Sequence, residues 1–526
     1  MATTEAESPQ RMRDGDPTPA RAVTGHAAIH PPDCTNAADR SQHCPAPARR
    51  MVLVVAVLAS ALGFIDSTVV SIAIPAIRAS LDASLAAATW VQNGYLLSLS
   101  ALILVGGAAG DRFGVRDTFI AGIVAFAIAS VLCAVAWSPE VLIAARFLKG
   151  AAAAFTVPLS LALIAKNYPD ESRGRAIGAW AAASGITTAI GPVAGGWLLS
   201  AGGPEAWRWI FWINPPAAAL VVLLLLRVPA DAPRAAERLD LAGAALAALA
   251  LGLMAYGLTA LGGAQGAGAV SFASLGAGLA LIALFVWWEG RAANPMVELP
   301  LFQNRAFAGA NALTFLVYFA LGGVMFFLPM TLVSGWGLSE AAVGTVFLPF
   351  TAVMAVLSGF SGAYAGRNGP RLPIAVGAAV VALAFAWLGA TTGTRSLWTS
   401  VYPAMAILGV GMGLCVSPLS TAIMGAVPNE HSGEASGINN AVSRMAGLFA
   451  VAGLGVLVSA VFASGDVPAG ASFGEPIEGA GEGASEGFAA ATDRAFAAVA
   501  YSCAALAAAG AAIAWATQES RAAERG

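Results

Sequence analysis

The sequence predicts an all-α polytopic membrane protein with fourteen membrane-spanning helices, and three observations support this prediction. Hydrophobic residues make up 58% of the 526 residues and charged residues only 11%, whereas soluble proteins carry about 45–50% apolar and about 25% charged residues. The mean hydropathy is +0.74. Fourteen apolar runs approach or exceed the ~20 residues that a bilayer-spanning helix requires. Lipid is therefore the expected solvent for most of the chain.

The fourteen runs are joined mostly by short polar segments. Glycine and proline interrupt many of them, which membrane-embedded helices tolerate better than soluble helices do. The runs lie near residues 51–75, 86–109, 117–137, 140–165, 175–200, 209–227, 239–261, 269–288, 307–333, 340–364, 373–391, 398–425, 435–463 and 495–516.

The basic residues of the connecting segments predict the orientation. With a cytoplasmic N-terminus, twelve Arg and Lys residues fall on the inner side and only four on the outer side. Because the cytoplasmic loops of membrane proteins are enriched in Lys and Arg, both termini are expected to be cytoplasmic. The inner residues are Arg112, Arg116, Lys166, Arg173, Arg175, Arg227, Arg234, Arg238, Arg291, Arg305, Arg367 and Arg371; the outer ones are Arg78, Arg208, Arg395 and Arg494.

The segments outside the spans complete this topology. Residues 1–50 are polar, show no secretory signal and are expected to form a disordered cytoplasmic tail, and residues 517–526 form a second, short tail. The Gly- and Glu-rich segment 464–492 becomes the one long outer loop. Arg greatly outnumbers Lys, which indicates a bacterium with a GC-rich genome, and hence a location in the cytoplasmic (inner) membrane.

The chain also repeats itself. Val157–Ser160 is similar to Ser417–Ser420, 260 residues later, and Gly107–Arg116 is similar to Gly362–Arg371, 255 residues later. Repeats that keep the same orientation in the membrane indicate two parallel six-helix halves. We therefore predict a first bundle at 51–228, two inserted spans within 229–290, and a second bundle at 291–516.

Asp66 is the one acidic residue well inside a predicted span. Such a residue is costly in lipid and points to a functional site. It lies 15 residues after Met51, or about 22 Å from the cytoplasmic edge, and Arg146 lies six residues after Glu140, or about 9 Å from the outer edge. In a hydrocarbon core about 30 Å thick these depths are similar. An ion pair between Asp66 and Arg146 is therefore expected, the alternative to a functional role being a purely structural link between two helices.

Four further patterns lie in the first half. Gly63–Pro75 surrounds Asp66, and Gly107–Arg116 forms a glycine-rich turn between two spans. Gly185–Gly196 combines small residues with Pro192, and Trp207–Pro216 places three Trp and an Arg at a membrane interface. With these motifs, the chain resembles the major facilitator superfamily from about residue 55 to 460, and specifically its fourteen-spanner drug:proton antiporter branch.

The resemblance implies roles for these residues. Asp66 would be the proton carrier, with Arg146 taking part in proton coupling. Lys149 stands where the family usually has a neutral residue, and is either a second cation beside Asp66 or turned to another helix face. The turn residues Gly107, Asp111, Arg112, Gly114 and Arg116 would form a conformational latch, in which Asp111 caps a helix end or pairs with an arginine of the other half. Gly185, Gly191, Pro192, Gly195 and Gly196 resemble the motif of exporters.

A substrate cavity is expected between the halves. Arg444, with Asn439 and Asn440, lies within the span 435–463, where it either attracts polar substrate groups or binds neighbouring carbonyls. The span 307–333 contributes the aromatic residues Phe315, Tyr318, Phe319, Phe326 and Phe327, which face either the cavity or lipid.

Other function classes find little support. There is no phosphate-binding Walker loop, so the proton gradient and not ATP is the expected energy source, with no cofactor. His26, His30, Cys34, His43 and Cys44 cluster in the tail but fit no standard zinc spacing, so no metal site is expected. No enzyme, nucleic-acid partner or oligomer is predicted. The main expectation is a monomeric exporter of small hydrophobic molecules in exchange for protons; a proton-coupled symporter, or an exporter of one endogenous metabolite or antibiotic, is the alternative.

Overall fold

The computed structural model describes residues 46–203, 205–229, 240–262, 268–428, 432–468, 470–475 and 482–519, and every regular element in these ranges is a helix. Helices satisfy all backbone hydrogen bonds within one segment, which lipid demands. Within the described residues, thirteen helical segments are long and apolar enough to cross a membrane. The chain is therefore an all-helical membrane protein, as the sequence predicts.

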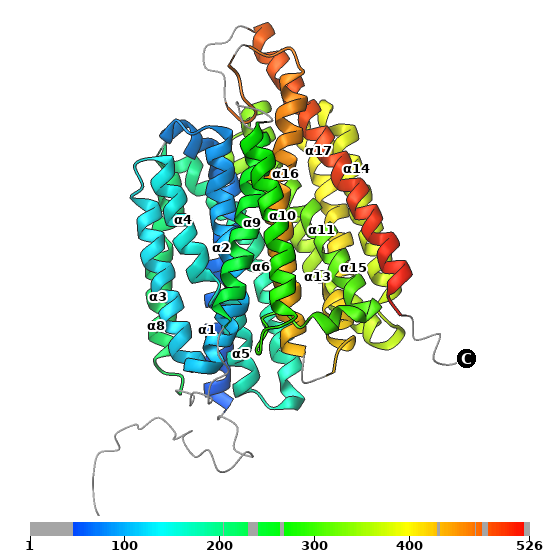
Figure 1. Cartoon of the computed structure of the whole chain (residues 1–526). Coiled ribbons are helices and arrows are strands. Elements are labelled where there is room, and N and C mark those ends of the chain that lie inside the picture. Colours follow the sequence, from blue (N-terminus) through cyan, green and yellow to red (C-terminus); the bar gives the residue numbers. More distant parts are fainter. Residues whose placement is uncertain are drawn as a thin grey trace, which may run out of the picture. The chain divides into compact units, whose positions relative to one another are not determined.

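The first half contains the helices of the first six predicted spans (Figure 1). Two of these spans are each divided into two helices where a proline follows a short break, because proline lacks an N–H and clashes with the preceding turn; the prolines are Pro158 and Pro215. The helices are α1 (Ala46–Leu81), α2 (Leu85–Phe113), α3 (Val115–Ala134), α4 (Pro139–Ala153), α5 (Val157–Asn167), α6 (Asp170–Gly202), α7 (Trp207–Trp212) and α8 (Asn214–Leu225).

The inserted pair consists of α9 (Leu241–Leu261) and α10 (Ala269–Glu289). Helix α9 packs on α10, α2 and α16, so it covers the seam between the two halves (Figure 1). The rings of Trp90 on α2 and Tyr256 on α9 lie 6.5 Å apart. Helix α10 exposes large apolar side chains, among them Phe272 and Trp287, as expected for a surface in contact with lipid.

The second half begins with the short helix η1 (Leu299–Gln303) and ends with a helix of 36 residues. Its other elements are α11 (Arg305–Met330), η2 (Thr331–Gly335), α12 (Glu340–Thr345), α13 (Phe347–Asn368), α14 (Arg371–Thr391), η3 (Thr392–Thr394), η4 (Leu397–Val401), α15 (Tyr402–Gly425), α16 (Ser432–Ala463) and α17 (Glu482–Thr517).

Two helices extend beyond the spans predicted for them. Helix α17 begins at Glu482, before residue 495 where the last span was placed, so the end of the predicted outer loop 464–492 is helical. The fifth predicted span, 175–200, falls within α6, a single helix of 33 residues. Because part of α6 lies outside the residues with described side chains, the count of fourteen spans stays a prediction. Residues 1–45 and 520–526 lie outside the described residues. They include the His and Cys residues of the N-terminal tail, for which no metal site is predicted.

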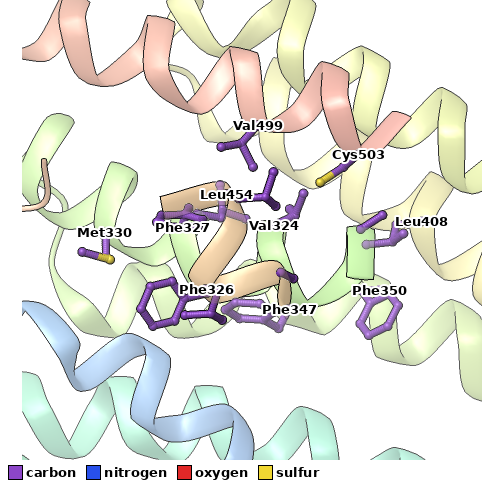
Figure 2. Close-up of a cluster of buried hydrophobic side chains, with 14 of the residues drawn as sticks. Val324, Phe326, Phe327, Met330, Phe347, Phe350, Leu408, Leu454, Val499 and Cys503 are labelled. Atoms are coloured by element: carbon purple, nitrogen blue, oxygen red, sulfur yellow. The ribbon is translucent and has the colours of Figure 1, made fainter. Parts of the chain in front are cut away.

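The apolar core consists of two clusters, and the larger one joins the two halves. We call the end that carries the C-terminus of α1 the Arg78 face, and the end that carries the α2–α3 turn the Arg112 face. On the Arg78 face, first-half residues such as Ile74 and Trp207 belong to the same core cluster as the second-half residues Phe327 and Phe347. Figure 2 shows the second-half part of this cluster, where Phe326, Phe327 and Val324 are surrounded by apolar side chains. The other cluster consists almost entirely of first-half residues.

Candidate functional site

The side chains of Asp66, Arg146 and Lys149 meet inside the first half and are completely buried. Arg146 Nη1 donates a hydrogen bond to Asp66 Oδ2 at 2.6 Å, and Lys149 Nζ donates to the other carboxylate oxygen, Oδ1. The expected Asp66–Arg146 pair is therefore present. Of the two alternatives for Lys149, the structure has the first: it is a second cation beside Asp66.

Helix α4 positions both cations. Ser138 caps its N-terminus by accepting from Val141 N, and Pro139 occupies the first turn. Arg146 and Lys149 are three residues apart and so project from one face of the helix. Gly150 lies against the backbone of α2: a methyl group added there would be 2.9 Å from the Tyr95 carbonyl carbon. This close approach of α4 to α2 brings the two cations to the core of the half.

Each cation has further contacts. Arg146 Nε donates to the Val91 carbonyl oxygen at 3.0 Å, and its guanidinium lies 4.3 Å from the centre of the Tyr95 ring. The Lys149 ammonium lies 4.7 Å from the ring centres of both Phe126 and Phe211. Arg146 is thus fixed to α2 by its backbone hydrogen bond, while Lys149 sits among aromatic faces with Asp66 as its charged partner.

The α2–α3 turn joins elements of one half. Gly114 links the two helices with a φ of 94°, a conformation that favours glycine. Asp111 forms an ion pair with Lys166 of α5 at 3.7 Å, instead of capping a helix or pairing with an arginine of the other half. Arg116 pairs with Asp117 at 2.8 Å and donates to the Val228 carbonyl. The other predicted latch residues are near: Arg112 lies over the Phe113 ring, and Gly107 faces Pro158.

The glycines of α6 face two different helices. Gly191 and Gly195 pack on α1, where a methyl group at Gly191 would lie 3.2 Å from Ile65 Cα. Gly196 packs on α12 of the second half, 3.2 Å from Gly344 Cα by the same measure. A methyl group at Gly344 would in turn lie 2.5 Å from the Pro192 carbonyl oxygen. The motif thus brings the halves into backbone contact at the Arg78 face; the surroundings of Gly185, also in α6, lie outside the described residues.

Arg78 is a contact that the sequence did not reveal. The predicted topology places it in an outer loop, yet only 4% of it is exposed. It donates to the Phe473 carbonyl at 2.6 Å, to Ser472 Oγ at 2.7 Å and to Glu475 at 3.2 Å, and so joins α1 to the connection between α16 and α17. Ser200 Oγ accepts from Ala341 N at 2.9 Å on the same face. Contacts across 395 residues leave no local signal in a sequence.

The predicted cavity residues contact different parts of the molecule. Asn439 Nδ2 donates to Thr314 Oγ1 at 2.7 Å and to Asn311 Oδ1 at 3.2 Å, linking α16 to α11. The Arg444 guanidinium lies 5.6 Å from the Phe64 ring centre, so α16 also touches α1 of the first half. Asn440 bonds the Ser436 carbonyl of its own helix, whereas Tyr318 and Phe319 are half-buried.

Phe326 and Phe327 do not face a cavity or lipid. They are almost fully buried in the second-half core, with Phe327 against Phe473 at 6.0 Å (Figure 2). The sequence does not determine their direction, because helical periodicity alone does not separate a core face from a lipid face when both are apolar.

Comparison with known proteins places the fold and the motifs in one family. The Major Facilitator Superfamily model matches residues 56–452. The chain belongs to the major facilitator superfamily. This superfamily member is 33% identical over 404 residues to the multidrug resistance protein Stp of Mycobacterium tuberculosis (strain CDC 1551 / Oshkosh), covering 76% of this chain and 73% of Stp.

Two further comparisons bear on branch and fold. A probable actinorhodin transporter of Streptomyces coelicolor is 32% identical over 468 residues, covering 87% of this chain and 79% of that protein. A solved bacterial homologue of the human lysosomal transporter Spinster, inward-facing and occupied, superposes with a TM-score of 0.62 at 18% identity, covering 90% and 98% of the two chains. The sequence relatives are drug-resistance and antibiotic transporters, consistent with the drug:proton antiporter branch and with a multi-pass protein of the bacterial inner membrane.

Proposed function

We propose that this superfamily member exports small molecules in exchange for protons, with Asp66, Arg146 and Lys149 as the proton-coupling site. The observation that supports this most directly is a carboxylate without solvent exposure, held by two cations in the interior of a membrane protein. Such an arrangement is costly to bury and marks ion or proton pathways in membrane proteins. No residue is assigned a catalytic role.

Two features support alternating access as the mechanism. The sequence repeat and the two six-helix halves are the usual basis for rocking of one bundle against the other around a central site. The glycine contacts between α6 and α12 and the hydrogen bonds of Arg78 tie the two halves together at the Arg78 face. We infer that these contacts close the outer side while the cytoplasmic side gives access to substrate, and that the latch residues act when the halves reverse.

The direction of the proton follows from the proposed orientation. The positive-inside distribution of Arg and Lys supports cytoplasmic termini and an Arg78 face that points outward. A proton that enters through the site then releases about 2.3 kcal/mol per 100 mV of membrane potential, in addition to the contribution of the pH gradient. This energy drives export, and no nucleotide or cofactor is required.

The substrate is proposed to be a small, largely apolar molecule. Support comes from α16, where Arg444 lies beside the Phe64 ring and Asn439 is bonded to Thr314 of α11, the helix that also carries the half-buried Tyr318 and Phe319. The names of the relatives support two possible substrate ranges for the same export activity. One is broad drug efflux, as in Stp, and the other is export of one antibiotic, as in the actinorhodin transporter.

The test is accumulation of a panel of dyes and antibiotics, including ethidium, in cells that overexpress the chain, with and without a protonophore. Lower accumulation that the protonophore reverses supports proton-driven efflux, and selectivity for one compound supports the narrower reading. Asp66→Asn is expected to abolish the effect. Asp82→Asn is the matched control, because Asp82 is exposed and its φ of 51° is one that Asn tolerates. Unchanged protonophore-sensitive efflux in the Asp66 variant removes Asp66 from the mechanism.

A further inference from the structure

The buried site holds more positive than negative charge. Asp66 supplies one negative charge, and Arg146 and Lys149 supply two positive charges, with none of the three side chains exposed. The remaining groups around Lys149 are the Cys133 thiol and Phe126 on α3, Phe211 on α7, and Tyr95 of α2 beside Arg146. Arg444 of the second half, which lies over the Phe64 ring of α1, is again a cation. No second anion is found among the groups that the structure places around the site.

Charge counting restricts how this site binds and releases a proton. With all three groups ionised, the site carries one unpaired positive charge, and protonating Asp66 would leave two cations facing each other with no anion. Buried charges without partners are strongly disfavoured. Arginine side chains stay protonated in proteins. Release of the Lys149 proton, by contrast, leaves one Asp66–Arg146 pair and no net charge.

The geometry around Lys149 suits both forms of its amine. As an ammonium it donates to Asp66 Oδ1 and lies 4.7 Å from the centres of two aromatic rings, which attract a cation. As a neutral amine it still donates to the same oxygen, so losing the proton leaves Asp66 hydrogen-bonded at both oxygens. Lysine is also the cation whose protonation responds to burial, unlike arginine.

We propose that Lys149, and not Asp66 alone, carries the exchangeable proton of this transporter. The Asp66–Lys149 pair binds one proton in total: the loaded state is a carboxylate with an ammonium, and the unloaded state is a carboxylate with a neutral amine. Because the two groups are hydrogen-bonded, the apparent pKa of this proton belongs to the pair and not to either residue alone. Arg146 is the positioning residue, since it keeps Asp66 ionised while its own Nε is fixed to the Val91 carbonyl. This inference rests on the proposed proton antiport and identifies the group that performs it.

The chain offers an unusually clean test, because Lys149 and Lys166 are its only lysines. Full-length protein with ¹³C-labelled lysine, in detergent or lipid, gives two ε-methylene NMR signals, and Lys166→Arg assigns them. The expected result is that the Lys149 signal shifts in one step between about pH 5 and pH 9, the range expected of a group that exchanges protons near neutral pH. A Lys149 signal that stays constant across that range overturns the proposal.

Transport measurements on Lys149 variants provide a second, independent test. In proteoliposomes with ethidium as the probe, Lys149→Gln fixes the site as neutral and Lys149→Arg fixes it as charged. Either variant is expected to lose accumulation driven by a pH gradient, while ethidium exchange without a gradient persists in at least one of them. Gradient-driven accumulation that survives in either variant shows that Asp66 carries the proton alone. If wild-type protein does not move ethidium, the proposed function is in question, and the NMR titration still decides the state of Lys149.

Discussion

The two halves predicted from the sequence repeat have different interiors. In the first half, α4 places Arg146 and Lys149 into a buried charged site. At the equivalent positions 260 residues later, α15 carries Ala406 and Gly409. There the helix lies directly on α13: a methyl group at Gly409 would be 2.5 Å from the Phe350 carbonyl oxygen.

This difference shows how the halves divide their tasks. The second half has an apolar core of closely packed helices (Figure 2), and the buried polar contact between its helices α11 and α16, made by Asn439, is neutral. The first half buries the charged side chains of Asp66, Arg146 and Lys149. We infer that proton chemistry resides in one half, and that the other provides a rigid body against which it moves.

The largest expected effect comes from removing the anion of the charged site. Asp66→Asn leaves Arg146 and Lys149 buried without a counter-charge, and breaking such a buried pair costs about 3–5 kcal/mol of unfolding free energy. Thermal unfolding of the purified protein in detergent measures the loss. Adding Lys149→Met should restore part of it, because one uncompensated cation is then gone. Equal stability of the Asp66 variant and wild type would contradict the assigned charges.

A smaller effect is expected where the second half relies on close packing. Gly409→Val pushes a branched side chain into the α13 backbone, and overpacking of this kind costs about 2–3 kcal/mol. Gly359→Ala on α13 is the control, since a methyl group there has no neighbour within 4 Å. If both variants unfold at the same temperature, α15 and α13 are not in backbone contact.

Removing the neutral hydrogen bonds of Asn439 in the second half should lower the unfolding free energy less still. Asn439→Ala removes the hydrogen bonds to Thr314 and Asn311, with an expected cost of about 1–2 kcal/mol. Asn368→Ala, at the exposed end of α13, serves as the comparison. The unfolding midpoint in detergent should fall for the first variant alone. A fall as large as that of Asp66→Asn would argue against the division between the halves.

The smallest expected effect lies outside the spans of the first half. Hydrogen bonds from Ser80 and Arg208 lower the pKa of Glu205 from its ordinary value of 4.5. A lowered pKa contributes stability above the ordinary value, and this contribution disappears as the pH falls through the lowered one. Because Glu205 is largely exposed, the contribution stays within about 0.5 kcal/mol. Glu205→Gln should therefore reduce the unfolding midpoint at pH 7 only slightly and leave it unchanged under strongly acidic conditions.

Hydropathy and charge were sufficient to locate the helices, because the bilayer sets their length and composition. Depth along the membrane was sufficient to pair Asp66 with Arg146. It left the direction of Lys149 open, because depth does not determine how a helix is rotated about its axis. The partner of Asp111 and the breaks before Pro158 and Pro215 were not predicted for a related reason. They depend on how neighbouring helices pack, which the local sequence does not determine. The role of Arg78 depends on a segment 395 residues away.

The Arg78 contacts make the α16–α17 connection a strap across one end of the transporter. Four hydrogen-bonding groups, counting the Ala83 carbonyl, hold a single guanidinium, and three of them belong to the strap. In the proposed transport cycle, these hydrogen bonds must break before that end opens. We therefore expect a nanobody that binds residues 470–475 to slow transport without competing with the transported molecule.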